Sequence, residues 1–293
     1  MYNIISLVAG TLVSVMVMFN GELATHYGAF TANVITHVVG LCFITCLILV
    51  NKDKPFAKKL PKTLYIGGFI GATVTVSQNF AFKDLNVSTI LAISLLGQSI
   101  AGIIMDHYGL MNMPIVKMNK NKIFGLFLIL AGIAIMTNDF KLLPVFLAAL
   151  SGVNLVISRT INANLSEATN YRIGTFFNYV TGIILSIPVM FLLGKNEPAF
   201  TNFSISSNIP MYFAGILGVV IIAAQNICVK KVSSFLLTLL MFIGQVFMGI
   251  ILDWILSGSF SPLNLYGGVL VTSGLIINTY IDNKVLKNKD VII

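Results

Sequence analysis

Long apolar runs follow one another along almost the whole chain, and they limit its fold more than any other feature. Each run has roughly the 20 residues that an α-helix needs to cross the hydrocarbon core of a bilayer. Only helices and closed barrels satisfy their backbone hydrogen bonds in lipid. The pattern therefore predicts an all-α integral membrane protein with ten transmembrane helices. The runs lie at residues 4–20, 29–50, 64–82, 86–105, 122–138, 143–165, 173–194, 211–229, 234–254 and 265–281.

Composition excludes the main alternatives to a membrane protein. Apolar residues make up 57% of the 293 residues and charged residues 10%, whereas soluble domains carry about 25% charged residues. A soluble globular domain and a disordered chain are therefore excluded. The three cysteines, Cys42, Cys46 and Cys228, lie inside apolar runs, so we expect neither a disulfide framework nor a metal site.

Lysine and arginine are distributed unequally between the two sets of connecting segments. If the N-terminus is cytoplasmic, only Lys83, Lys141 and Lys195 fall on the outer side of the membrane. Positive residues concentrate in cytoplasmic loops, so this bias predicts that both termini are cytoplasmic. The formal net charge of +8 is thus explained by membrane orientation, and we expect no nucleic-acid partner.

A sequence repeat relates the two halves of the chain. Residues 97–106 read GQSIAGIIMD, and residues 244–253 read GQVFMGIILD. The offset is 147 residues here and 142 residues near both ends of the repeat, because the connecting loops differ in length. Further pairs at these offsets are Tyr65/Tyr212, Gly68/Gly215, Gly71/Gly218, Gln78/Gln225, Asn79/Asn226, Gly10/Gly152, Asn20/Asn162, Leu23/Leu165, Gly40/Gly182, Gly125/Gly267 and Gly132/Gly274.

The repeat predicts two structural units, residues 1–140 and residues 141–293, with five apolar runs each. Because five is odd, the second unit enters the membrane upside down relative to the first. Inverted repeats are a hallmark of many secondary transporters, whose substrate site lies near the bilayer midplane between the repeats. The predicted architecture is therefore ten helices arranged as two inverted five-helix repeats that work by alternating access.

Two short motifs carry a family resemblance. Residues 20–23 (NGEL) and 162–165 (NANL) share Asn-x2-Leu, and residues 97–109 contain Gly-Gln-x7-Asp-x2-Gly. With ten predicted spans, the chain resembles the drug/metabolite transporter superfamily, and within it the YdcZ-type branch of bacterial inner-membrane proteins. The resemblance implies a multi-pass protein of the bacterial cytoplasmic (inner) membrane. It also implies a secondary transporter or exporter of a small organic metabolite or drug-like molecule, without naming the substrate.

Four glutamines are candidate substrate-binding residues. Gln98 and Gln245 lie near the midpoints of their runs, and Gln78 and Gln225 lie nearer the ends. An amide at this depth must find hydrogen-bonding partners, so it faces the interior of the bundle. The alternative is that these amides only join neighbouring helices.

Three further substrate-binding candidates surround a histidine near the middle of the second run. His37 follows Asn33 by one helical turn, its counterpart in the repeat is Tyr179, and Asn154 lies in the middle of the sixth run. Histidine titrates near neutral pH and could relay protons. A hydrogen-bonded structural histidine is the alternative.

Four residues are candidates for coupling or gating. Glu22 ends the first run and could bind a proton or cation, or it could be a solvated loop residue. Arg159 is the one arginine inside a run. It could bind an anionic group, or its side chain could reach the lipid headgroups. Asn20 and Asn162 are the asparagines of the repeated motif.

Two alternatives to a secondary transporter remain open, a passive channel or facilitator and a non-transporting membrane scaffold. An enzyme is not expected, because the chain lacks His-Glu-x-x-His, Gly-x-Ser-x-Gly and a paired-carboxylate cluster. The expected partners are a small-molecule substrate, the lipid bilayer and a proton as coupling ion. We expect no cofactor, and a monomer or homodimer. The scarcity of acidic residues in the runs suggests a neutral or weakly charged substrate that amides recognise.

Overall fold

The computed structural model describes residues 2–112, 122–136, 141–228, 234–258 and 261–289. All regular secondary structure in these residues is helical, which confirms the predicted all-α class. The elements are α1 (Tyr2–Tyr27), α2 (Ala29–Asn51), η1 (Lys62–Tyr65), α3 (Gly67–Ala81), α4 (Val87–Tyr108), η2 (Leu110–Asn112), α5 (Lys122–Met136), α6 (Leu142–Ala168), α7 (Tyr171–Leu193), α8 (Pro198–Thr201), η3 (Ile209–Phe213), α9 (Ala214–Cys228), α10 (Ser234–Ser257) and α11 (Pro262–Lys289).

Each predicted apolar run contains one long helix, but some boundaries differ from the prediction. Helix α1 continues beyond residue 20 to Tyr27. Its polar Asn20 is buried, and Gly21 lies directly against the Phe82 ring, so packing keeps this segment helical. Helices α3 and α9 are shorter than predicted, and each follows a 3₁₀ turn that begins beside a proline, which fits the fixed φ of proline.

Seven helical segments among the described residues are long and apolar enough to cross a membrane. The protein is therefore a multi-pass membrane protein. A further apolar helix, Ile123–Met136, is shorter. The seven segments are Tyr2–Tyr27, Ala29–Asn51, Val87–Met105, Leu142–Ala168, Tyr171–Leu193, Ile209–Cys228 and Leu239–Ser257.

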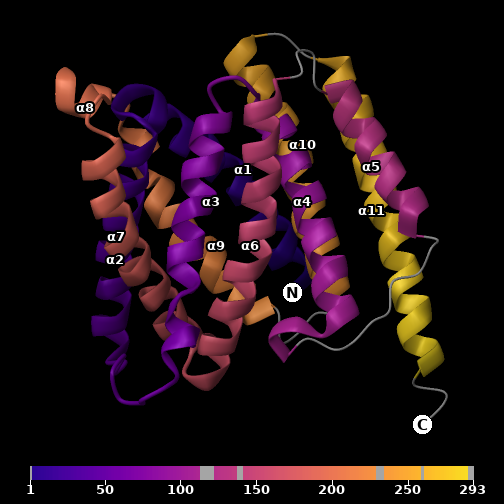
Figure 1. Cartoon of the computed structure of the whole chain (residues 1–293), viewed down its shortest axis with the longest axis horizontal. Helices are drawn as coiled ribbons and strands as arrows, with labels where there is room; N and C mark the ends of the chain where they lie inside the picture. The colour runs from indigo at the N-terminus through magenta and orange to yellow at the C-terminus, as the bar shows by residue number, and fades with distance from the viewer. Residues whose placement is uncertain (1, 113–121, 137–140, 229–233, 259–260, 290–293) are drawn as a thin grey trace.

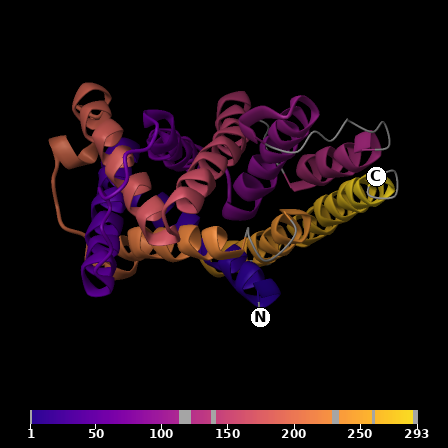
Figure 2. The same cartoon turned by 90° about the horizontal axis from the view of Figure 1, so that it is seen from below.

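The helices form a bundle with one pair set at its edge. Helices α5 and α11 pack against each other on the right in Figure 1, and they contact the rest of the bundle through α4 and α10. On the other side of the bundle, α2 packs on α7 and α9, and α3 packs on α6 and α7. Figure 2 shows α11 extending away from the bundle along α5. Segments far apart in the sequence thus enclose the centre.

Glycines bring α4 and α6 into close contact. A Cβ atom added to Gly97 would lie 2.0 Å from the carbonyl oxygen of Ala149, and one added to Gly152 would lie 1.7 Å from that of Ser94. Both distances are shorter than any real contact of a Cβ atom. The two backbones therefore touch, and only glycine fits at either position.

The same pair of contacts occurs between α1 and α10. A Cβ atom on Gly244 would lie 2.4 Å from the carbonyl oxygen of Leu7, and one on Gly10 would lie 2.0 Å from that of Met241. Each of these four residues corresponds, at the offsets of the sequence repeat, to one residue of the contact between α4 and α6. Helices α5 and α11 meet in a reciprocal way, through Gly125 with Gly274 and Gly132 with Gly267.

Candidate functional site

A cavity of about 110 Å³ lies at the centre of the bundle. Seven helices contribute to its wall, α1, α2 and α3 from the first half and α6, α7, α9 and α10 from the second half. The lining residues are Val13, Met16, Asn20, Thr36, His37, Gly71, Val74, Thr75, Gln78, Leu155, Ser158, Arg159, Asn162, Asn178, Tyr179, Gly218, Ile221, Ile222, Gln225, Asn226 and Gln245.

The cavity collects eight of the twelve residues that the sequence singled out. The other four are Gln98, Asn33, Asn154 and Glu22, which do not line it. The eight lining residues are Asn20, His37, Gln78, Arg159, Asn162, Tyr179, Gln225 and Gln245.

Three of the residues outside the cavity make contacts elsewhere. The Asn33 amide nitrogen donates to the Ser186 hydroxyl at 2.8 Å, between α2 and α7. The Asn154 amide nitrogen donates to the Thr73 hydroxyl at 2.9 Å, between α6 and α3. Glu22 lies at the end of the bundle that carries α8, where its carboxylate accepts a hydrogen bond from Asn208 at 2.8 Å.

His37 and Tyr179 face each other across the cavity. Nδ1 of His37 lies 2.8 Å from the carbonyl oxygen of Asn33. A carbonyl oxygen only accepts, so Nδ1 carries the hydrogen, and Nε2 of the neutral ring is an acceptor. The two ring centroids lie 5.6 Å apart. The Tyr179 hydroxyl donates to the carbonyl oxygen of Gly215 at 3.1 Å, which fixes the tyrosine against α9.

The repeated asparagines make equivalent hydrogen bonds in the two halves. The Asn20 side-chain oxygen accepts from the Thr36 hydroxyl at 2.6 Å, which joins α1 to α2. The Asn162 amide nitrogen donates to the Asn178 side-chain oxygen at 2.8 Å, which joins α6 to α7. Thr36 and Asn178 correspond to each other at the offset of 142 residues. Sequence reasoning missed both, although that offset relates them as it relates Asn20 to Asn162.

Arg159 is the charged residue of the cavity wall. Its Nη2 atom donates to the side-chain oxygen of Gln98 at 3.3 Å, so Gln98 holds the arginine from behind the cavity. The Arg159 Nε atom is buried without a hydrogen-bond partner in the part of the chain that the structure describes. No aspartate or glutamate lines this cavity among the described residues.

The amides of the two halves differ in how they meet the cavity. Gln225 and Asn226 both line it, whereas Gln78 lines it and Asn79 instead donates to the carbonyl oxygen of Ala29 at 3.2 Å. The Asn226 amide nitrogen is buried and has no partner among the described residues. Gln245 lines the cavity and accepts a hydrogen bond through its backbone from Ser14 at 2.6 Å.

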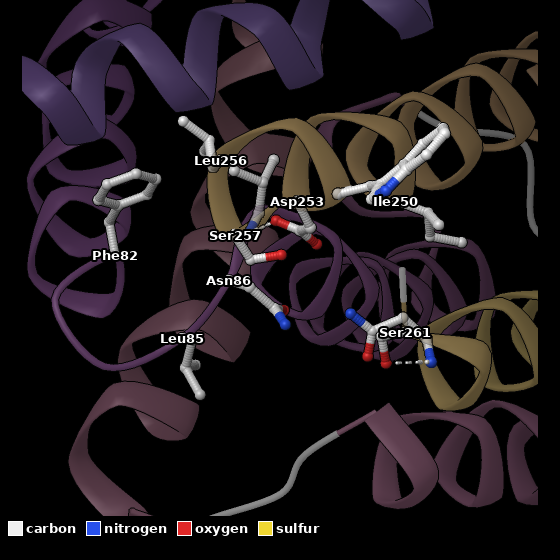
Figure 3. A pocket seen from close by; sticks show the side chains of 11 residues that line it. Phe82, Leu85, Asn86, Ile250, Asp253, Leu256, Ser257 and Ser261 are labelled. Atoms are coloured by element: carbon white, nitrogen blue, oxygen red, sulfur yellow. Dashed lines mark hydrogen bonds between the residues drawn. The ribbon is translucent and has the colours of Figure 1, made fainter. Parts of the chain in front are cut away.

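A second cavity, of about 420 Å³, lies where α3, α4, α10 and α11 meet (Figure 3). The Asp253 carboxylate accepts hydrogen bonds there from the backbone nitrogens of Val87 at 2.8 Å and Ser88 at 3.0 Å. A carboxylate at a helix N-terminus satisfies free N–H groups and interacts favourably with the helix dipole. Asp253 thus joins the end of α10 to the start of α4. The side chain of its sequence counterpart, Asp106, lies outside the described residues.

A family model matches almost the whole chain, over residues 1–135 and residues 143–277. Its description is "Putative inner membrane exporter, YdcZ". The chain belongs to this family. Membership confirms the resemblance inferred from the sequence motifs. Together with the apolar helices, it identifies a multi-pass inner-membrane protein of a transport family.

The fold of this YdcZ-family protein also occurs in a solved structure. A chain described only as "Crystal structure of protein" aligns with a TM-score of 0.65 and 14% sequence identity, over 97% of this chain and 96% of that chain. At this identity the similarity concerns the fold alone. A comparison with curated proteins gave no match. Exporter families form a class distinct from enzymes, and membership in one leaves the substrate open.

Proposed function

We propose that this protein is a secondary transporter that carries a small organic molecule across the inner membrane by alternating access. The observation that carries the proposal is the central cavity, because helices from both halves of the chain build its wall together. A site between two halves can be exposed to either side of the membrane in turn, if the halves rock against each other.

The proposed halves, residues 1–140 and 141–293, are five-helix repeats with inverted orientation, giving ten spans. Two findings support this arrangement. The family model matches residues 1–135 and residues 143–277 separately. The close glycine contacts also occur in equivalent pairs, such as Gly97 with α6 and Gly244 with α1. Pairs of this kind are expected from a pseudo-two-fold axis in the membrane plane.

The proposed gate at the α8 end of the bundle is a polar aromatic cluster. The hydroxyls of Tyr27 and Tyr212 are hydrogen-bonded, and the Tyr27 hydroxyl also accepts from the backbone nitrogen of Ser206 at 3.1 Å. Leu23 and Met211 are buried beside them. These contacts join α1 to the segment before α9, so separating them would open this end of the cavity.

The proposed gate at the opposite end is an apolar cluster beside η1. The rings of Tyr65 and Phe177 meet edge to face, with centroids 4.6 Å apart, and Leu165 and Ile173 are buried in the same cluster. Tyr65 and Tyr212 correspond at the offset of 147 residues. The bias of lysine and arginine would put this end, and both termini, in the cytoplasm.

Proton coupling is part of the proposal. His37 is favoured as the proton carrier, because it lines the cavity and its Nε2 atom is an acceptor. Glu22 would act at the α8 end, where it bonds Asn208 outside the cavity. Gln78, Gln225, Gln245 and Tyr179 would contact the substrate. Asn20, Asn162 and Arg159 would change contacts as the halves move.

Counterflow in proteoliposomes tests the proposal. The purified protein is screened for solutes that raise its melting temperature, and each hit is then loaded inside vesicles as unlabelled solute. A transporter accelerates the uptake of labelled solute against such a load, and its flux saturates. Gln245→Ala should reduce the flux, whereas Ser273→Ala on α11, outside the cavity wall, should not.

The rival functions predict other results. A channel or facilitator gives linear flux without counterflow. A scaffold gives no flux, and Gln245→Ala then changes stability but no response to a solute. Either result overturns the proposed alternating access.

A further inference from the structure

The central cavity presents more hydrogen-bond donors than acceptors to its contents, and this imbalance defines the ligand that would fit. Of the described residues, six have a buried side-chain nitrogen or oxygen without a partner. Only Arg159 and Asn226 among them line the cavity, and the unpartnered atom is an N–H donor in both. The unpartnered oxygens of Asn33, Asn79 and Asn278 lie away from the cavity wall.

The charge of the wall has the same bias. Arg159 supplies a permanent positive charge, since guanidinium stays protonated in proteins. No carboxylate among the described residues lines the cavity to neutralise it. Gln98, which accepts from Arg159 at 3.3 Å, is neutral. A buried guanidinium that keeps an N–H free is stabilised by any ligand that brings an anionic oxygen.

We infer that the transported substrate is a small monocarboxylate, with its carboxylate bound by Arg159 and Asn226. The inference rests on the proposed function and narrows its substrate class. Carboxylate oxygens are acceptors only and match the planar fork of guanidinium. The same wall gives no anionic partner to an ammonium group, which argues against amines and zwitterions as ligands.

The remainder of the cavity fits a short apolar body. Val13 and Met16 of α1, Val74 of α3 and Leu155 of α6 provide apolar surface around the polar groups. A volume of about 110 Å³ is somewhat smaller than the roughly 150 Å³ cavity that holds one benzene molecule. The structure therefore favours an aliphatic acid of a few carbons over a drug-sized molecule.

Three ligands of nearly equal shape test this inference on the purified full-length protein. Butyrate carries a negative charge, butyramide is neutral and butylamine is positive, and acetate to hexanoate vary the length of the body. Binding is measured by titration calorimetry and by the rise in melting temperature. We expect saturable binding of a monocarboxylate in this series, and weaker binding of the amide and the amine.

The matched variants are Arg159→Gln in the cavity and Lys195→Gln on the exposed surface, since each removes one positive charge. Arg159→Gln should weaken carboxylate binding by about 30-fold or more, as for other buried charge pairs. Lys195→Gln should leave it unchanged, and Arg159→Lys should retain part of it. The comparison of butyrate with butyramide on the wild-type protein keeps the test valid if Arg159→Gln does not fold.

Three results would overturn the inference. They are the absence of binding by every monocarboxylate in the series, equal binding of the amide or the amine, and unchanged carboxylate binding by folded Arg159→Gln. Counterflow of a neutral or cationic solute would overturn it while leaving the proposed transport intact. Conversely, carboxylate binding without any counterflow would support this site and contradict the transport mechanism.

Discussion

His37 and Tyr179 occupy corresponding positions in the two halves of the chain, yet they bring different chemistry to one cavity. A Cβ atom added to Gly40 would lie 2.1 Å from the Tyr179 ring, and one added to Gly182 would lie 2.3 Å from the His37 ring. The backbone contacts are thus reciprocal. Only one of the two rings, however, titrates near neutral pH.

The comparison separates scaffold from function. Where the halves agree, as in the glycine contacts, the residues set how closely the helices approach each other. The halves differ at the positions that supply charge or a proton. Arg159 corresponds to Val17 at the offset of 142 residues, so one half alone places a positive charge in the cavity. A symmetric scaffold with asymmetric chemistry suits a carrier that holds one substrate molecule in one orientation.

The largest expected effect tests the agreement between the halves. Gly152→Ala and Gly10→Ala would each push a methyl group into a facing carbonyl oxygen, at 1.7 Å and 2.0 Å. We expect each to destabilise the protein by about 3 kcal/mol, at the upper end for overpacking, measured as loss of thermal stability in detergent. Gly102→Ala is the control, because nothing lies within 4 Å of its added methyl group. Tolerance of alanine in one half alone would contradict equivalent scaffolds.

The next effect compares two carboxylates that hold helix starts at opposite ends of the bundle. Glu197 accepts from the backbone nitrogens of Phe30 at 2.8 Å and Thr31 at 2.9 Å, at the start of α2. Asp53 accepts from Asn170 at 3.0 Å and pairs with Arg172, at the start of α7. We expect Glu197→Gln and Asp53→Asn each to cost about 2 kcal/mol, as for hydrogen bonds to charged groups. Thermal denaturation at neutral pH measures both, and an undiminished melting temperature in either variant would refute that carboxylate's role.

Asp53 adds a pH dependence to this pair. Hydrogen bonds from the Arg172 guanidinium hold the pKa of the Asp53 carboxyl below its usual value of 3.8. The stabilisation is therefore complete above that value and is lost as the pH falls through the lower, folded pKa. The wild type and Asp53→Asn should differ in melting temperature at neutral pH and converge in strong acid. A difference that grows on acidification would contradict this sign.

A smaller effect on stability separates the two facing rings. Tyr179→Phe loses the hydrogen bond to Gly215 and should cost about 1 kcal/mol, with the pH dependence of transport retained. His37→Gln should instead flatten that dependence between about pH 5 and 8. Arg159 and Tyr179 are the other titratable groups of the cavity wall, and neither titrates in this range. A pH profile unchanged in His37→Gln would exclude His37 as the proton carrier.

The smallest expected effect compares the two proposed gates. Tyr27→Phe removes the hydrogen bonds to Tyr212 and Ser206, and should cost about 0.5–1 kcal/mol. Tyr65→Phe should change stability by less, because the contact of Tyr65 with Phe177 is made by the ring alone. Thermal denaturation of both variants measures the difference. Equal losses would show that the two clusters are held together in the same way.

The amino-acid sequence by itself determined the helices and their polar positions. Apolar runs separated by charged or proline-containing segments fix where helices form, because backbone groups in lipid must bond within the helix. The repeat motifs identified Asn20 with Asn162 and Gln78 with Gln225 as related pairs. These conclusions depend on local composition and on order along the chain, so no tertiary contact was needed.

Only the tertiary structure decided which polar side chains meet the cavity. Gln98 and Gln245 share one motif, yet Gln245 lines the cavity while Gln98 bonds Arg159 behind it. Thr36 and Asn178 joined the site without any signal beyond their offset. The physical reason is helix rotation: adjacent residues point about 100° apart. The facing direction of each is set by glycine contacts with helices distant in the sequence, which local sequence does not encode.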